Sequence, residues 1–139
     1  MNAVGNLYGT TVLGGFDNDC GGFGCGTIFK LTPSMGTWTF SILHTFDNTD
    51  GAEPSGVLIF DSSGALYGTC EYGDQGYGNV FKLSPSGNSW TLDVLHSFVK
   101  KGDGANPQAA LIFDQQGVLY GTASTGGVHN SGGVFSITP

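Results

Sequence analysis

The stretch Leu66-Tyr67-Gly68-Thr69 is one of three copies of the same four residues in the chain. The same four residues stand at Leu7-Tyr8-Gly9-Thr10 and at Leu119-Tyr120-Gly121-Thr122, so the tyrosine recurs after 59 and then 53 residues. Periods of about 50 residues are typical of propeller blades rather than of helical solenoids. The sequence therefore predicts a tandem repeat that forms one repeat domain over residues 1–139.

Each residue of this phrase has an expected structural role. Successive side chains of a strand point to opposite faces, so Leu66 and Tyr67 should serve the interfaces on the two sides of a sheet. Gly68 should leave room where a neighbouring backbone or aromatic ring comes close. We therefore expect the phrase to build the repeat rather than to carry chemistry.

The rest of each unit divides into strand-like segments that also recur. An apolar first strand, Val57–Asp61 with its copy Ala110–Asp114, precedes a turn in which aspartate caps the backbone and glycine supplies a positive φ. A third strand at 27–31, 79–83 and 133–137 leads in each case to a proline. Asp50–Pro54 and its copy Asp103–Pro107 connect one unit to the next.

The fourth strand has a period of two over nine residues, and it occurs twice. The residues expected on one face are Trp38, Phe40, Ile42, His44 and Phe46, and in the copy Trp90, Leu92, Val94, His96 and Phe98. This alternation is typical of a strand with two different faces.

Four antiparallel strands in a unit of about 53 residues match a propeller blade. We predict an all-β, β-propeller-type repeat of about 2.5 blades, with a partial blade at 1–53, a complete blade at 54–106 and a partial blade at 107–139. Closed propellers need about four to eight blades. Self-association into a homodimer ring or an open filament, or the remaining blades of a longer chain, should therefore complete the structure.

The combined pattern is specific. It consists of Leu-Tyr-Gly-Thr, Gly-x-Val-Phe-x-Leu-x-Pro, Leu-His-x-Phe, Asp-Gly-x-x-Pro and Leu-Ile-x-Asp-x-x-Gly. It resembles the GloVer tandem repeats of bacterial extracellular proteins over nearly the whole chain, and it is more loosely similar to NHL-type propeller blades. The resemblance implies an exported or cell-surface protein with propeller-like repeats, and it brings no catalytic residues with it.

The charge balance argues against two classes of partner. The net charge is −7, and the four cationic residues are all lysines, whereas nucleic-acid binding needs a cationic surface. No run of about 18 apolar residues could span a bilayer. The first residues lack the features of a signal peptide, so the signal for export is expected to be absent from this chain.

The cysteines leave alternatives open. Cys20 and Cys25 bracket a glycine-rich loop and are candidates for a local disulfide, which would imply an oxidising compartment. With His129 they could instead contribute to a zinc site, although the spacing lacks a second ligand pair. Cys70 takes the place of Thr11 and Ala123 in the other units, which favours a small buried side chain.

Two further groups are candidates for binding, whereas the two histidines of the fourth strand are expected to have a structural role. His44 and His96 should pack and donate a hydrogen bond to a neighbouring loop. Carboxylates in the glycine-rich connections are the candidate calcium ligands, and no other cofactor is expected. They are Asp47, Asp50, Glu53 and Asp103. Exposed side chains of the loop after the second strand are the candidate ligand-binding residues, because aromatic rings stack on sugars and peptides. They are Tyr72, Asp74 and Tyr77.

These observations favour a non-enzymatic extracellular module for adhesion, scaffolding or surface self-assembly. The alternative is a carbohydrate-binding or carbohydrate-active propeller, with its site at the central opening or on the face that carries the loops. Paired carboxylates could serve such chemistry, since only their distance in space matters.

Overall fold

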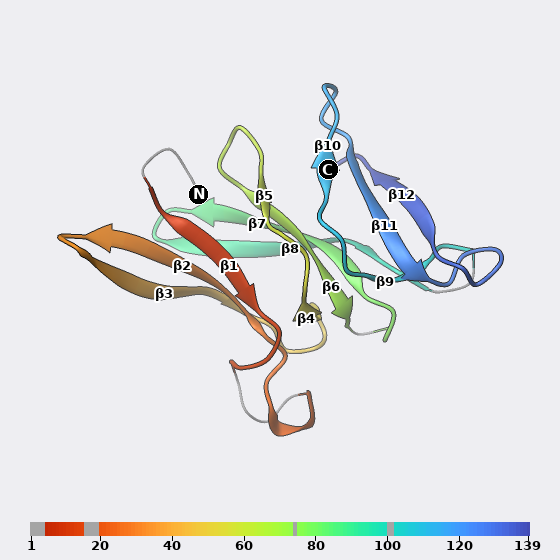
Figure 1. Cartoon of the computed structure of the whole chain (residues 1–139), viewed down its shortest axis with the longest axis horizontal. Coiled ribbons are helices and arrows are strands. Elements are labelled where there is room, and N and C mark those ends of the chain that lie inside the picture. The colour runs from red at the N-terminus through yellow and green to blue at the C-terminus, as the bar shows by residue number, and fades with distance from the viewer. Residues whose placement is uncertain (1–4, 16–19, 74, 100–101) are drawn as a thin grey trace.

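The computed structural model describes residues 5–15, 20–73, 75–99 and 102–139, and these are all β apart from one 3-10 turn at Cys20–Gly22. Three antiparallel sheets follow one another along the chain and lie side by side in an open row (Figure 1). The part of the chain that is described contains no helix with the length and apolarity needed to cross a membrane.

The three sheets share one pattern of pairing. The first sheet has the order β1-β2-β3, with strands at Leu7–Thr11, Thr27–Ser34 and Thr37–Thr45. The middle sheet has the order β4-β6-β7-β8, with strands at Ala52–Pro54, Leu66–Tyr72, Asn79–Ser86 and Ser89–Ser97, and β5 (Ile59–Phe60) also pairs with β6. In the third sheet β10 (Ile112–Phe113), β11 (Leu119–Thr125) and β12 (Gly133–Ile137) pair in this order, and β9 (Ala105–Pro107) also pairs with β11.

The repeated phrase serves both sides of the middle sheet, as predicted. Leu66 is fully buried in a cluster with Ile28 and Phe46 of the first repeat. Tyr67, 2% exposed, lies in a second cluster with Leu111, which directly precedes β10, and with Leu119 of β11. Neighbouring residues of one strand thus hold the sheets on either side.

The expected role of Gly68 is also confirmed. A Cβ at this position would lie 2.6 Å from Cζ of Phe81 on one side and 2.9 Å from Cδ2 of Leu58 on the other. Gly9 and Gly121 meet the rings of the equivalent phenylalanines in the same way. Glycine is needed because an aromatic ring of the next strand packs directly on the backbone.

The first strand differs from the prediction, because it is divided into two short pieces. Pro54 pairs with Cys70, and Ile59 pairs with Tyr67. Between these pairs β6 uses two residues, whereas the inner segment uses the four residues 55–58, so regular pairing is interrupted. Part of the predicted connection is therefore a strand, β4, and β5 is shorter than the predicted segment.

The fourth strand contains a β-bulge that the alternating pattern does not reveal. Ile28 pairs with His44 while the next residue, Phe29, pairs with Ile42, so Leu43 is the extra residue. Since adjacent residues of β2 point to opposite faces, Ile42 and His44 do too. The prediction that Trp38 and Phe46 share a face was therefore wrong, and the copy in β8 has the same shift.

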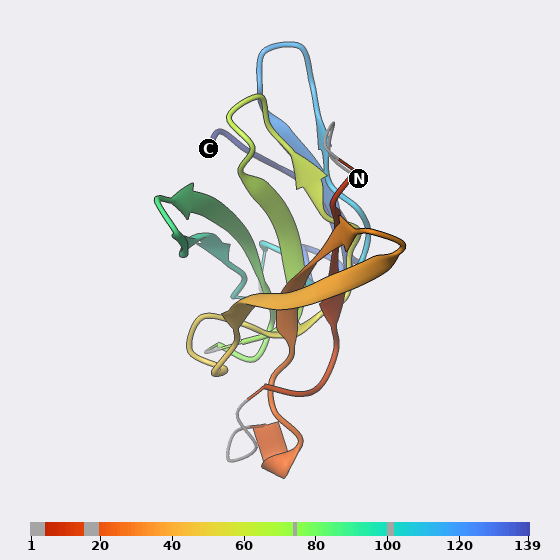
Figure 2. The same ribbon diagram turned by 90° about the vertical axis from the view of Figure 1, so that its left-hand side faces the viewer.

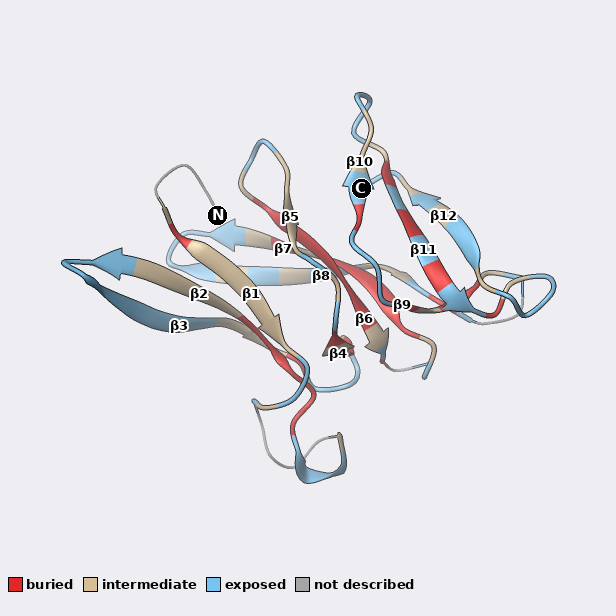
Figure 3. Cartoon of the chain, viewed as in Figure 1, coloured by how far each residue is buried: buried red, intermediate tan, exposed pale blue. Residues whose placement is uncertain are grey.

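The core runs along the middle sheet, and the outer sheets leave apolar surface exposed. Buried residues follow β6, whereas much of β3 and β12 is exposed (Figure 3). Trp38, Phe40 and Ile42 of β3 are 51%, 56% and 52% exposed. Seen from the side of the first sheet, the loop with Cys20 projects at one end, and the β5–β6 and β10–β11 turns lie at the other (Figure 2).

Candidate functional site

The β5–β6 turn is organised by the carboxylate of Asp61. Its Oδ1 accepts hydrogen bonds from the N–H of Ser63 (2.8 Å), the N–H of Ala65 (3.0 Å) and the hydroxyl of Ser63 (2.7 Å). Asp114 repeats the arrangement in the β10–β11 turn, where it accepts the N–H groups of Gln116 and Val118. Both turns therefore hold a carboxylate in a fixed position.

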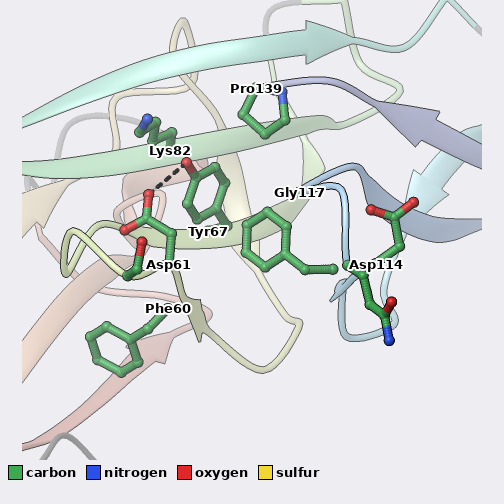
Figure 4. A pocket seen from close by; sticks show the side chains of 10 residues that line it. Phe60, Asp61, Tyr67, Lys82, Asp114, Gly117 and Pro139 are labelled. Atoms are coloured by element: carbon green, nitrogen blue, oxygen red, sulfur yellow. Dashed lines mark hydrogen bonds between the residues drawn. The ribbon is translucent and has the colours of Figure 1, made fainter.

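A tyrosine and a lysine extend this network in the middle sheet. The hydroxyl of Tyr67 donates to Oδ2 of Asp61 at 3.0 Å, and Nζ of Lys82 lies 5.3 Å from the centre of the Tyr67 ring (Figure 4). A cation at this distance from an aromatic ring is attracted to it. Tyr120 donates to Asp114 in the same way, at 3.2 Å, but Ser136 stands where the middle sheet has Lys82.

The network changes the acidity of its members. Partial burial alone would raise the pKa of Asp61, but the hydrogen bonds from Ser63, Ala65 and Tyr67 outweigh it and hold the pKa below its ordinary value. Burial raises the pKa of Tyr67. The hydrogen bond between Lys82 and the Tyr67 hydroxyl raises the pKa of Lys82. Asp61 thus remains an anion, and Lys82 remains a cation, around neutral pH.

A pocket of about 490 Å³ lies at this network, between the two turns (Figure 4). Residues of the middle sheet and of the third sheet line it. They are Phe60, Asp61, Ser62, Tyr67, Lys82, Phe113, Asp114, Gln115, Gly117 and Pro139. The Asp61 carboxylate is fully engaged in shaping the turn. The polar side chains of Ser62, Gln115 and Lys82 line the pocket beside the aromatic rings, so its wall offers both hydrogen-bonding groups and flat apolar surfaces.

The predicted ligand-binding loop is only partly displayed. Tyr72, at the end of β6, is 39% exposed. Tyr77 is partly buried and packs against the cluster between the middle and third sheets, so the expectation that it is exposed was wrong. Asp74 lies outside the described residues. A role of these residues in binding stays a prediction.

The candidate calcium ligands are used mainly within their own loops. Asp47 accepts the hydroxyl and the N–H of Thr49, which lowers its pKa. The Asp50 carboxylate contacts His44, whereas the contact of Glu53 is made by its backbone N–H, which donates to the carbonyl of Cys25 in another loop at 2.9 Å and does not involve the Glu53 carboxylate. Asp103 belongs to the corresponding loop of the next repeat. No group of three or more potential metal ligands is found within the described ranges, and calcium binding stays a prediction.

The histidines have the structural role expected of them. Nε2 of His44 lies 2.7 Å from Oδ2 of Asp50, and His96 makes the equivalent contact to Asp103 at 2.8 Å. The edge of the His44 ring also packs on Phe46, with the ring centres 4.8 Å apart. Each histidine therefore joins the fourth strand to the loop that follows it.

Cys20 and Cys25 form a disulfide, with their Cα atoms 5.3 Å apart. Both sulfurs are used in this bond, so neither is a thiolate ligand for zinc, and His129 lies in the exposed β11–β12 loop. Cys70 is free and fully buried, as predicted. Burial, followed by the nearby charge of Asp50, raises its pKa well above the ordinary value.

The sequence carries a signal for the aspartate–tyrosine contact beside the pocket. Asp61 and Asp114 were predicted only as turn caps, yet each stands six residues before the tyrosine to which it is bonded. This repeated Asp-x5-Tyr spacing indicates a contact. Lys82 could not be assigned in the same way, because the equivalent position in the third unit is Ser136.

Comparison with known proteins identifies the repeat. No curated protein and no solved structure matches the chain. The model of one family, described as the Gloeobacter/Verrucomicrobia repeat, matches residues 1–139. Because this match covers every residue of the sequence, the chain belongs to the Gloeobacter/Verrucomicrobia repeat family.

Proposed function

We propose that the chain is a non-enzymatic, extracellular repeat module that acts in adhesion, scaffolding or surface assembly by joining copies of itself end to end. The observation that carries the proposal is a contact that recurs at both junctions between sheets. Tyr8 meets Phe60 edge-on with ring centres 5.1 Å apart, and Tyr67 meets Phe113 at the same distance.

A second aromatic contact recurs beside the first. Phe46 packs on Phe81 at 5.4 Å, and Phe98 packs on Phe135 at 5.1 Å. One face of each sheet is thus complementary to the opposite face of the next. Such nearest-neighbour interfaces are the basis of repeat architectures, and terminal faces need a cover.

Both ends of the row expose the halves of this interface. The first sheet exposes Trp38, Phe40 and Ile42 on the face away from the middle sheet. In the third sheet Tyr120 is 36% exposed and Val134 is 78% exposed. Both lie on the face that points away from the middle sheet. These two sets are the counterparts of residues that meet inside the chain.

The internal junction supports one specific fit between the two ends. Trp90 lies near Tyr8 across the first junction, with ring centres 6.3 Å apart. Trp38 is the counterpart of Trp90, and Tyr120 is the counterpart of Tyr8. Trp38 of one copy would therefore pack against Tyr120 of the next in a head-to-tail contact.

The closed form of such an assembly would be a propeller. Two copies would supply about five or six blades, which lies within the usual range, whereas a rotation that does not close would give a filament. The remaining blades of a longer chain would use the same end faces. The disulfide and the bacterial repeat family support an extracellular location.

Light scattering over a range of protein concentrations tests the proposal. The chain should have a mass at least twice that of the monomer, and Phe40→Asp should reduce it to the monomer mass without loss of β structure by circular dichroism. Val99→Asp, at another exposed apolar residue, is the matched control and should still assemble. A wild-type chain that stays monomeric at all concentrations would contradict the proposal.

A further inference from the structure

A second cavity lies at the junction of the first and middle sheets, where β3 and β8 come into contact. Its volume is about 440 Å³, which is within the range of small-ligand sites. Lys30 of β2 and Ser41 of β3 line it from the first sheet, and Asn88, Ser89 and Trp90 line it from the β7–β8 hairpin. Both walls are complete hairpins, β2–β3 and β7–β8, whose sheets pack on each other within the chain.

Trp90 supplies a fixed aromatic surface to this cavity. The indole lies edge-on to Tyr8 with ring centres 6.3 Å apart, and it packs against the buried cluster that contains Ile28 and Leu66. The residue is nevertheless only partly buried, and it lines the cavity. An aromatic side chain that is already held by packing loses little entropy when a ligand covers it.

Lys30 lacks the carboxylate neighbour that its counterpart in the middle sheet has. Lys82 pairs in register with Asp93 and is also hydrogen-bonded to the Tyr67 hydroxyl. Ser41 takes the place opposite Lys30, and within the described residues no ion pair joins Lys30 to a carboxylate. In a chain of net charge −7, Lys30 is therefore a local positive charge that favours an anionic group in the cavity.

The other polar side chains of the cavity have hydrogen-bonding capacity to spare. Asn88 is exposed, and its amide has no hydrogen bond to another residue of the described ranges, so it offers two donors and an acceptor. The Ser89 hydroxyl donates to the carbonyl of Ser86 at 2.9 Å, and the Ser41 hydroxyl makes only a long contact of 3.5 Å to the carbonyl of Lys30. Both hydroxyl oxygens can still accept hydrogen bonds.

We propose that this cavity binds a carboxylate-bearing sugar unit of an acidic polysaccharide. The C–H face of the sugar ring would pack on the Trp90 indole, its carboxylate would pair with the Lys30 amino group, and its hydroxyls would bond to Asn88 and the serines. An apolar side chain would leave these polar groups without partners, and a neutral sugar would not use the charge of Lys30. The cavity lies at a junction inside the chain, so it does not depend on the joining of copies.

Titration of the chain with acidic oligosaccharides provides the first test. The probes are tetramers of galacturonate, of mannuronate and of the glucuronate-containing hyaluronan, each with a form in which the carboxyl groups are reduced to alcohols. At least one acidic tetramer should bind with a Kd of about 1 mM or lower, and its reduced form should bind at least about tenfold more weakly. If no acidic tetramer reaches this affinity, or if the reduced form binds equally well, the proposal is overturned.

Matched substitutions show whether the sugar occupies this cavity. Lys30→Gln should weaken binding of the acidic tetramer at least about tenfold, whereas Lys82→Gln, at the equivalent lysine of the next repeat, should leave it unchanged. Circular dichroism should show the same β structure for both variants. Equal effects of the two substitutions on binding would overturn the proposal.

The two tryptophans of the chain give a direct readout of the position of the sugar. In Trp38→Phe the remaining Trp90 should change its fluorescence when the acidic tetramer is added. In Trp90→Phe the remaining Trp38 should not respond, because it lies outside the cavity. A response from Trp38 together with a silent Trp90 would place the sugar elsewhere and overturn the proposal.

Discussion

Phe98 of the middle repeat packs on Phe135 of the third sheet, with the ring centres 5.1 Å apart, and the Phe98 side chain is fully buried. Replacing it by alanine removes one of the two aromatic contacts across this junction, the other being that of Tyr67 with Phe113. Phe98→Ala should lower the free energy of unfolding by about 3–5 kcal/mol, as measured by chemical denaturation. Val128→Ala, at a residue that is 83% exposed, should change it by less than about 0.5 kcal/mol. Similar effects of both substitutions would contradict the assigned interface.

The glycine of the repeated phrase can be tested with a control in a neighbouring sheet. Gly68→Ala would bring a methyl group to 2.6 Å from Phe81, so the variant should lose about 1–3 kcal/mol of stability through overpacking. Gly133→Ala has no atom within 4 Å and should leave the unfolding midpoint nearly unchanged. Equal unfolding midpoints for the two variants would show that the Phe81 ring does not exclude a methyl group at position 68.

Asp61 should make stability depend on pH in acid. Its pKa is lowered in the folded state, so its contribution is complete above its ordinary value of 3.8 and is lost as the pH falls through the lower, folded-state value. Asp61→Asn should cost about 1 kcal/mol at pH 7 by weakening the turn. Denaturation at a series of pH values should give a shallower decline below pH 3.8 for the variant. Parallel wild-type and variant profiles would rule out this role.

The disulfide closes a short loop, so its removal should have a moderate effect. Reduction of the Cys20–Cys25 bond should lower the free energy of unfolding by about 2 kcal/mol, because the unfolded chain regains the conformational entropy that this short closed loop removes. The double variant Cys20→Ala, Cys25→Ala should not respond to the reductant. In this folded variant Cys70 should not react with iodoacetamide at pH 8, because it is buried and its pKa is raised. Rapid alkylation of Cys70 would contradict its placement.

Features that depend on one strand and its neighbours could be predicted from the sequence. The opposite roles of Leu66 and Tyr67 follow from the pleat, and the room at Gly68 follows from the lack of a side chain. The third strand and the buried Cys70 also follow from the alignment of the repeats. In each case an equivalent residue recurs in another repeat, so two positions of the sequence support the same assignment.

Features that need an extra residue or two sheets could not be predicted. The bulge at Leu43 leaves the alternation of residue types intact while it reverses the faces, so the pattern gave no sign of it. Tyr77 packs into a junction that exists only when two repeats are in place. The pocket at Lys82 also lies between repeats, and the sequence alone does not show which residues of neighbouring units face each other.

Mixing two blocked variants tests most directly whether the two ends of the row are complementary. Phe40→Asp disables the first sheet, and Tyr120→Asp disables the third. Each variant alone should be monomeric by light scattering, and an equimolar mixture should form a dimer and nothing larger, because one intact junction remains. Either variant assembling alone, or a mixture that stays monomeric, would contradict head-to-tail joining.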